Sequence, residues 1–273
     1  MVKELIDMSQ QPEPTVQQLF DLTGRVALLT GASGYLGSSF AQALAEAGAT
    51  VVVGSRDVAR AKEALQALPG PAQHHAVVLD QMDHASLESG FRAAVKAAGK
   101  IDILVNNGHE ALGKDLTNVT GEEFTRHLGN ATSYFLLARL LHDHAVERKA
   151  PASVIMIGSM YGVVGSYPDA YAGLCNASPV AYHTLKGGIV HMTRHLAVYW
   201  ATDGVRVNCL SPGPFPNEPR VPHEMVERLC SKSPMKRMGK PHELKGTLIL
   251  LASDAGSYIT GQNILIDGGW TAW

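Results

Sequence analysis

The chain has 273 residues, enough to bury a complete hydrophobic core as one domain. Hydrophobic residues make up 45% and charged residues 18%, and the formal net charge of -2 gives no field that would gather nucleic acid or anionic lipid. No run of about 18 apolar residues could span a bilayer, and acidic residues stand where a signal peptide needs an apolar stretch. We therefore expect a cytoplasmic protein that binds neither nucleic acid nor membrane.

Residues 1–20 are expected to form a leading arm, because Pro12 and Pro14 interrupt regular structure. After the arm, short apolar runs alternate with stretches of helical periodicity. The runs, expected as strands, are Val26–Leu29, Thr50–Val53, Ala76–Leu79, Ile101–Val105, Val154–Ile157, Val205–Leu210 and Ile264–Ile266. The expected helices lie near residues 36–47, 58–67, 85–98, 121–147, 180–203 and 241–252. This pattern predicts an α/β fold over residues 21–273, a single Rossmann-type domain whose doubly wound parallel sheet of about seven strands carries helices on both faces.

Two segments interrupt this alternation. Segment 166–179 is polar, and segment 212–237 opens with prolines from Pro212 to Pro222 that force irregular chain. Ligands of an open α/β sheet bind beyond the carboxyl ends of the strands, and both segments follow expected strands. We therefore predict a substrate loop near 166–179 and a lid near 212–237.

A glycine-rich segment, Thr30–Gly37, follows the first expected strand and opens the first expected helix. Glycines in this context allow a tight turn and let the backbone approach a pyrophosphate, which the positive end of the helix attracts. The predicted contacts of this dinucleotide site are Gly31, Ser33, Gly34, Tyr35, Leu36 and Gly37.

The end of the second expected strand bears on the choice of dinucleotide. A carboxylate there would bind a ribose 2′-hydroxyl, whereas Ser55 is followed by Arg56, whose guanidinium can pair with a 2′-phosphate. The alternative is that Arg56 is an exposed arginine at the start of a helix that Asp57 caps. We favour NADP(H) as the cofactor, with NAD(H) as the alternative.

Tyr182 and Lys186 stand four residues apart in a segment of helical periodicity, so they share one face of the helix. A neighbouring positive charge favours the phenolate and would lower a pKa that is ordinarily about 10. A tyrosine with a lowered pKa can exchange a proton near neutral pH. Because this spacing is common on helix surfaces, the pair gains weight only from the motifs that accompany it.

Together these segments resemble the short-chain dehydrogenase/reductase family over about residues 22–273. The glycine loop, Asn106-Asn107-Gly108 in place of the family's Asn-Asn-Ala-Gly, and the Tyr182–Lys186 pair occur in the family's order. The resemblance implies catalytic roles for Asn130, Ser159, Tyr182 and Lys186. It implies further cofactor contacts at Asp80, Gln81, Asn107, Gly108, Tyr182, Lys186, Pro212 and Gly213.

The roles implied by the family fit together chemically. Tyr182 would exchange the substrate proton, and Ser159 would hydrogen-bond the substrate oxygen. Lys186 would lower the tyrosine pKa and bind the nicotinamide ribose, while Asn130 would hold the water that passes the proton outward. Hydride transfer belongs to the cofactor. The family also implies a homo-oligomer, either a tetramer or a dimer.

Three departures from the family pattern bear on specificity. The glycines at 31, 34 and 37 have the spacing of the extended, epimerase-like branches. Gly34 stands where a basic residue often supports NADP binding, which weakens the preference for NADP. Ser159 and Tyr182 are also farther apart than is usual, and the predicted substrate loop occupies the extra length.

Residues suited to other chemistry are assigned structural roles. His191 and His195 share a helix face but have no evident third ligand, so we expect surface histidines and no metal site. The three cysteines show no paired motif, which predicts free thiols with Cys209 buried. Trp270 and Trp273 are expected either in the core or against a neighbouring subunit.

We therefore predict an NADP-dependent oxidoreductase that interconverts a secondary alcohol and a ketone on a small molecule. A small hydroxylated substrate such as a sugar acid or polyol, as in gluconate 5-dehydrogenase, is favoured by polar residues of the loop and lid. These residues are Asp169, Asn176, Ser178, Asn217, Glu218 and Arg220. The alternative enzyme is a 3-oxoacyl-acyl carrier protein reductase, which would need a basic surface at the pocket mouth. The alternative class is a non-catalytic nucleotide sensor on the same fold.

Overall fold

A parallel sheet of seven strands forms the centre of the protein, whose computed structural model describes residues 12–217 and 221–273. The order across the sheet is β3-β2-β1-β4-β5-β6-β7, and each neighbouring pair is parallel. The strands are β1 Val26–Thr30, β2 Thr50–Ser55, β3 His75–Val78, β4 Ile103–Asn106, β5 Ala152–Ile157, β6 Val205–Pro212 and β7 Asn263–Ile266. Every predicted strand occurs, with its ends within two residues of the predicted bounds. The predicted doubly wound sheet is confirmed.

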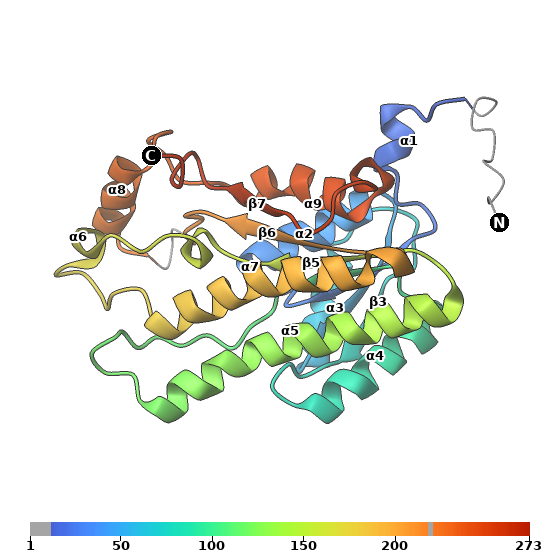
Figure 1. The fold of residues 1–273 in the computed structure, drawn as a ribbon, viewed down its shortest axis with the longest axis horizontal. Coiled ribbons are helices and arrows are strands. Elements are labelled where there is room, and N and C mark those ends of the chain that lie inside the picture. Colours follow the sequence, from blue (N-terminus) through green and yellow to red (C-terminus); the bar gives the residue numbers. More distant parts are fainter. Residues whose placement is uncertain (1–11, 218–220) are drawn as a thin grey trace.

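Helices cover both faces of this sheet (Figure 1). One face carries α4 (His84–Ala98), α5 (Gly121–Arg148) and α7 (Val180–Trp200). The other carries α2 (Tyr35–Glu46), α3 (Val58–Gln66) and α9 (Lys245–Ala252). Successive side chains of a strand point to opposite faces, so Val26 and Leu28 pack into one core and Ala27 and Leu29 into the other.

Local sequence sets the ends of the helices that support the site. The long helix α5 begins with a capping box, in which Thr120 and Glu123 satisfy each other's backbone N–H groups. Asp57 caps α3 and Asp83 caps α4, which ends at Gly99 in the left-handed conformation with φ of 82°. Helices α5 and α7 lie side by side across the front of the sheet in Figure 1, and α7 carries Tyr182.

Three short helices occur where the sequence analysis predicted no helix: α1 (Val16–Phe20), α6 (Pro168–Tyr171) and α8 (His223–Lys232). Helix α1 lies within the predicted arm, whose residues 1–11 are outside the described ranges. Arg228 of α8 donates hydrogen bonds to the carbonyls of Asp169 (3.0 Å) and Ala172 (2.7 Å), so the lid helix is fixed to α6 of the predicted substrate loop. These helices depend on such tertiary contacts, because segments this short do not sustain helix alone.

Single 3-10 turns complete the described secondary structure. The helix predicted over 180–203 is α7 followed by such a turn, and the helix predicted over 241–252 is a turn followed by α9. These turns are Met160–Gly162, Ala201–Asp203, Pro241–Leu244 and Asp254–Gly256.

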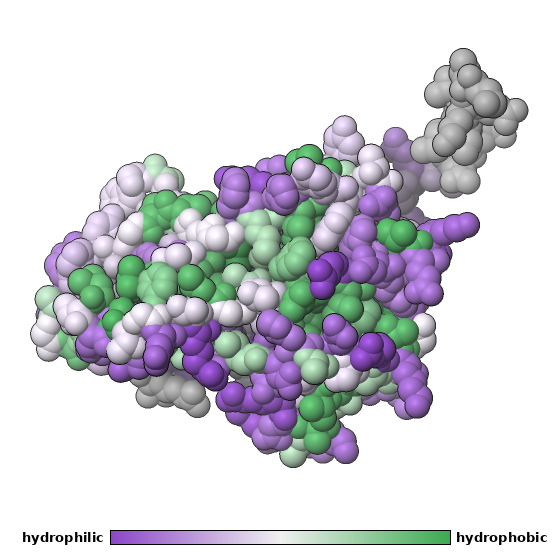
Figure 2. Space-filling model, turned by 60° about the horizontal axis from the view of Figure 1, so that its bottom comes forward, coloured by the Kyte–Doolittle hydropathy of each residue, from purple (hydrophilic) through white to green (hydrophobic). Residues whose placement is uncertain are grey.

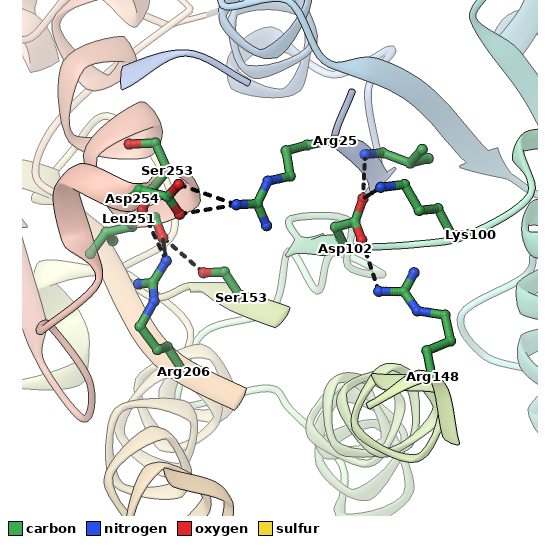
Figure 3. Close-up of polar contacts among 10 residues, drawn as sticks. Arg25, Lys100, Asp102, Arg148, Ser153, Arg206, Leu251, Ser253 and Asp254 are labelled. Atoms are coloured by element: carbon green, nitrogen blue, oxygen red, sulfur yellow. Dashed lines mark hydrogen bonds and ion pairs between the residues drawn. The ribbon is translucent and has the colours of Figure 1, made fainter. Parts of the chain in front are cut away.

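Polar clusters close the amino-terminal edge of the sheet, opposite the site (Figure 3). Asp102 is 4% exposed and accepts hydrogen bonds from the Val26 N–H (2.9 Å), Arg148 (2.9 Å) and Lys100 (3.0 Å). In the second cluster, Arg206 of β6 donates to the carbonyls of Leu251 (2.9 Å), inside α9, and Ser253 (3.2 Å), just after it. These contacts tie β1, β4, α5 and α9 together at this edge.

Figure 2 shows hydrophilic and hydrophobic residues interspersed over the side that lies at the bottom of Figure 1. Among helices of the described ranges, none has the length and apolar character that a membrane crossing requires. Cys209 is fully buried and all three cysteines are free thiols, as predicted. Trp270 is 3% exposed and belongs to the core, whereas Trp273 is 70% exposed.

Candidate active site

A cleft of about 780 Å³ lies beyond the carboxyl ends of the strands. Residues from the ends of β1, β2, β4, β5 and β6 meet there with α7. The cleft is lined by all of the predicted cofactor contacts, namely Gly31, Ser33, Gly34, Tyr35, Leu36, Gly37, Ser55, Arg56, Asp80, Gln81, Asn107, Gly108, Tyr182, Lys186, Pro212 and Gly213. Ser159 also lines it, while Asn130 stands behind its wall.

The glycine loop is shaped to bring backbone close to a ligand. Gly31 has φ of +70°, and a Cβ on Gly37 would collide with the carbonyl oxygen of Gly31. Asn107 donates to the carbonyls of Thr30 (3.0 Å) and Gly31 (3.1 Å), which fixes the loop against β4. Helix α2 begins after Gly34 without a side-chain cap, so its first N–H groups remain free to bind an anion. The loop therefore fits the pyrophosphate of a dinucleotide.

Basic side chains border the cleft where β2 ends. Arg56 lines the cleft, as does Arg60, which the sequence reasoning missed although it lies one helical turn farther along α3. The carboxylate of Asp57 accepts from the N–H groups of Ala59 (3.0 Å) and Arg60 (3.2 Å), so it caps α3. The sequence left open whether Arg56 binds the cofactor or only precedes a helix that Asp57 caps. In the structure Asp57 is the cap, and Arg56 also lines the cleft.

Ser159, Tyr182 and Lys186 gather where β5 meets α7. Ser159 follows β5 and is 7% exposed, and Lys186 is 2% exposed. The Lys186 ammonium nitrogen donates to the carbonyl of Ile157 (2.7 Å) and lies 5.5 Å from the centre of the Tyr182 ring. The predicted sharing of one helix face by Tyr182 and Lys186 is therefore confirmed.

The predicted direction of the Tyr182 pKa is wrong for this structure. Burial raises the pKa of the Tyr182 phenol, and a hydrogen bond with Ser159 offsets only part of that increase. The ammonium of Lys186 is itself desolvated, which lowers its pKa to about 8. The Lys186 ammonium is turned toward the Ile157 carbonyl and does not offset the effect of burial on the Tyr182 pKa.

The side chain of Asn130, inside α5, joins two backbone segments of the cleft wall. Its Oδ1 accepts from the Glu110 N–H (2.7 Å), and its Nδ2 donates to the carbonyls of Glu110 (3.2 Å) and His127 (2.7 Å). The amide therefore fixes the segment after β4 to α5. Its role in holding a water stays a prediction.

His109 is one of the histidines beside Tyr182 that the sequence analysis missed. It follows Gly108, lines the cleft, and its ring centre lies 6.1 Å from that of Tyr182. The available signal was the motif itself, because Asn106-Asn107-Gly108-His109 ends in histidine where the family has glycine.

Three of the polar residues on which the substrate prediction relied have partners elsewhere in the protein, and a fourth, Asn217, does not line the cleft. Asp169 pairs with Lys232, Asn176 donates to the Gly113 carbonyl (3.1 Å), and Ser178 bonds to His183 (2.9 Å). None of these three lines the cleft. Glu218 and Arg220 lie outside the described residues.

A doubly wound sheet with a glycine-rich dinucleotide cleft at its carboxyl edge, and with serine, tyrosine and lysine gathered at one end, defines a nicotinamide-dependent oxidoreductase. The chain matches the family model described as Enoyl-(Acyl carrier protein) reductase over residues 31–271. It therefore belongs to the short-chain dehydrogenase/reductase family, and it is an NAD(P)-dependent enzyme acting on CH–OH groups. This class replaces the non-catalytic sensor that the sequence left open.

Relatives of known activity cover nearly the whole chain. It is 33% identical to D-arabinitol 2-dehydrogenase (ribulose-forming) of Scheffersomyces stipitis, over 93% of this chain and 96% of that protein. It is 34% identical to the rhamnolipids biosynthesis 3-oxoacyl-acyl-carrier-protein reductase of Pseudomonas aeruginosa, over 92% and 98%. A solved gluconate 5-dehydrogenase from Burkholderia cenocepacia J2315, in complex with NADP and tartrate, is similar with a TM-score of 0.83 at 27% identity, over 95% of this chain and 100% of that one.

Proposed function

We propose that this enzyme is an NADP-dependent dehydrogenase that interconverts a secondary alcohol and a ketone on a small hydroxylated substrate, a polyol or sugar acid. The observation that carries the proposal is the arrangement of the cleft. Ser159, Tyr182 and Lys186 lie together at one end, and Arg56 and Arg60 border the cleft beyond β2. The first group suits proton exchange with an alcohol, and the second suits a phosphate on the adenosine ribose.

Each residue of the reactive end has a defined task. Tyr182 donates a proton to the substrate oxygen during reduction and accepts it during oxidation, and Ser159 hydrogen-bonds the same oxygen. Lys186 holds a positive charge 5.5 Å from the Tyr182 ring, which stabilises the phenolate once it forms. Asn130 keeps the wall behind Tyr182 in place. The nicotinamide, when bound, supplies or accepts the hydride.

Replacing Tyr182 tests the chemistry. Tyr182→Phe removes the hydroxyl and keeps the ring, so we expect turnover to fall by about 100-fold or more. The matched control is Tyr199→Phe, which removes the hydroxyl of an exposed tyrosine on the same helix. Wild-type turnover in the Tyr182→Phe variant would refute the mechanism.

Support for NADP comes from the two arginines and from the similar Burkholderia enzyme, whose solved structure is a complex with NADP. Arg56→Ala and Arg60→Ala are each expected to weaken NADPH binding about tenfold and to leave NADH binding unchanged. Lys62→Ala serves as the control, because this exposed lysine of α3 does not line the cleft. Tighter binding of NADH than of NADPH by the wild type would contradict the proposal.

Support for a polyol or sugar acid comes from the relatives, whose names include D-arabinitol, galactitol and gluconate dehydrogenases. A screen of pentitols, hexitols and aldonates with both nucleotides measures kcat/KM for each pair. We expect the highest values with NADP and a polyhydroxylated substrate. A preference for hydrophobic mono-alcohols would count against this substrate class.

A 3-oxoacyl-acyl carrier protein reductase remains the second candidate, because the Pseudomonas relative and the matched family model carry such names. A carrier protein is acidic, so its reductase would need free basic side chains at the cleft mouth. Among the described lid residues, Arg228, Lys232 and Arg237 are each paired with a carboxylate, and Lys236 donates to the Ser231 carbonyl (2.9 Å). This pairing favours the small-molecule substrate. NADPH oxidation with a 3-oxoacyl thioester, compared with that polyol screen, decides between the two.

A further inference from the structure

Besides His183, its neighbour in the chain, two histidines from other elements lie beside Tyr182, and the proposed mechanism uses neither of them. The ring centres of His109 and His127 are 6.1 and 6.4 Å from that of Tyr182 and 6.5 Å from each other. His109 lines the cleft and its side chain is accessible to solvent, whereas His127 is 3% exposed behind it. His109 is thus the nearer of the two to any substrate that reacts at Tyr182.

The position of His109 is fixed by its surroundings. It follows directly on Gly108, whose backbone N–H donates to Thr30 (3.0 Å) and whose carbonyl accepts from Gln81 (2.6 Å). On its other side, Asn130 holds the backbone of Glu110. The His127 ring meets the His109 ring edge to face, at an interplanar angle of 84°. The backbone on both sides of His109 is therefore held in place and its ring packs against His127, which places the imidazole to meet a substrate group in the cleft.

The imidazole of His109 is neutral near pH 7. Although His109 is open to solvent on its cleft side, the protein packed around the rest of the ring desolvates it and lowers its pKa, and the nearby Lys186 and His127 lower the pKa further. A neutral imidazole offers one hydrogen-bond donor and one acceptor. A hydroxyl group is also both donor and acceptor, whereas a carboxylate offers only acceptors and pairs better with a cation.

We infer that His109 binds a second hydroxyl group of the substrate, on the carbon next to the one that reacts at Tyr182. The Lys186 ammonium lies 5.5 Å from the centre of the Tyr182 ring and already donates to the Ile157 carbonyl, so it leaves His109 as the neutral donor and acceptor on this side of the cleft. The inference rests on the proposed function and narrows its substrate to one with hydroxyls on adjacent carbons.

A matched pair of alcohols tests the role of His109. Butane-2,3-diol and butan-2-ol share one carbon skeleton and differ by a single hydroxyl. His109→Ala is expected to lower kcat/KM about tenfold on the diol and less than twofold on butan-2-ol, because only the diol loses a hydrogen bond. His109→Gln keeps a neutral donor and acceptor and is expected to restore most of the diol activity. The control is His191→Ala, on the exposed face of α7.

The outcomes separate the inference from the function on which it rests. Equal losses on the two alcohols, or no loss on the diol, would overturn the role of His109. NADPH affinity, measured by fluorescence titration, should stay within twofold of the wild type, and a larger change would show that His109→Ala disturbs the cofactor site instead. If the wild type oxidises neither alcohol nor any polyol with either nucleotide, the proposed function fails and the inference fails with it.

Discussion

Removing the carboxylate of Asp102 should destabilise the fold strongly although the residue lies far from the active site. In Asp102→Ala, the Val26 N–H and the guanidinium of Arg148 lose a buried acceptor at 2.9 Å each (Figure 3). Lys100 is 42% exposed on its side chain and loses little, because water replaces its partner. The sequence placed Asp102 only within an expected strand, and the structure makes it the centre of this cluster.

The magnitude follows from burial. An unsatisfied buried donor costs about 1–3 kcal/mol, and removing one partner of a buried ion pair costs about 3–5 kcal/mol. The two costs are not additive, because both include the loss at Arg148. That side chain also keeps a hydrogen bond to the Ile101 carbonyl at 3.2 Å. We therefore expect Asp102→Ala to lower the free energy of unfolding by about 4 kcal/mol. Asp254→Ala, which breaks an exposed pair with Arg25, should lower it by about 1 kcal/mol or less.

Urea unfolding at fixed protein concentration, followed by circular dichroism, measures both variants.

A second test of the same reasoning measures how the stabilisation by Asp102 depends on pH. Burial raises the pKa of Asp102, but the bonds from Val26, Arg148 and Lys100 outweigh it, so the folded-state pKa is lowered. The stabilisation by Asp102 is therefore full above its unfolded pKa of about 3.9 and is lost as pH falls through the folded value. A loss at pH 7 no larger than that of Asp254→Ala would refute this reasoning.

Three further predictions concern the glycine loop, the tyrosine and a surface histidine. Gly37→Ala places a methyl against the Gly31 carbonyl, so NADPH binding should weaken by about tenfold or more in a fluorescence titration, and unchanged affinity would contradict the tight loop. Because burial raises the Tyr182 pKa above its usual value of about 10, the phenol stays protonated from pH 7 to 10, so alcohol oxidation should accelerate over this range while ketone reduction loses no rate to tyrosine ionisation. Alcohol oxidation that slows with rising pH would exclude tyrosine as the proton carrier. Desolvation lowers the pKa of His142, but its hydrogen bonds to Asp203 and a neighbouring aspartate outweigh that effect, so the folded-state pKa is raised. The protonated His142 therefore stabilises the fold fully below its unfolded pKa of about 6.5, and this contribution is lost as pH rises through the folded pKa. Asp203→Asn should therefore cost about 1 kcal/mol at pH 6 and less at pH 8.5 in urea unfolding.

The fold was predictable because its signals are local. Each strand contains a short apolar run, β1 and β5 are buried along their whole length, and such runs between amphipathic helices have few other arrangements. The missed helices α6 and α8 lack that signal. They hold together through contacts between segments about 60 residues apart, such as Arg228 with Asp169, which periodicity does not reveal.

The cofactor side of the cleft was also predictable from short motifs. Glycine spacing and the end of β2 carry their meaning in a few neighbouring residues, and all of the predicted cofactor contacts line the cleft. The substrate side was harder to predict. Asp169, Asn176 and Ser178 looked available in the sequence, but the folded chain gives each of them a partner away from the cleft.

The sequence by itself determined the succession of strands and helices along the chain, the dinucleotide loop and the spacing of Tyr182 and Lys186. Each of these depends on residues close together in the chain. Tertiary structure alone decided the electrostatics of the site. Burial raises the pKa of Tyr182 and lowers that of Lys186, and burial is a property of the packed core rather than of spacing. It also brought His109 beside Tyr182, because the ends of β4 and β5 are neighbours only in the folded sheet.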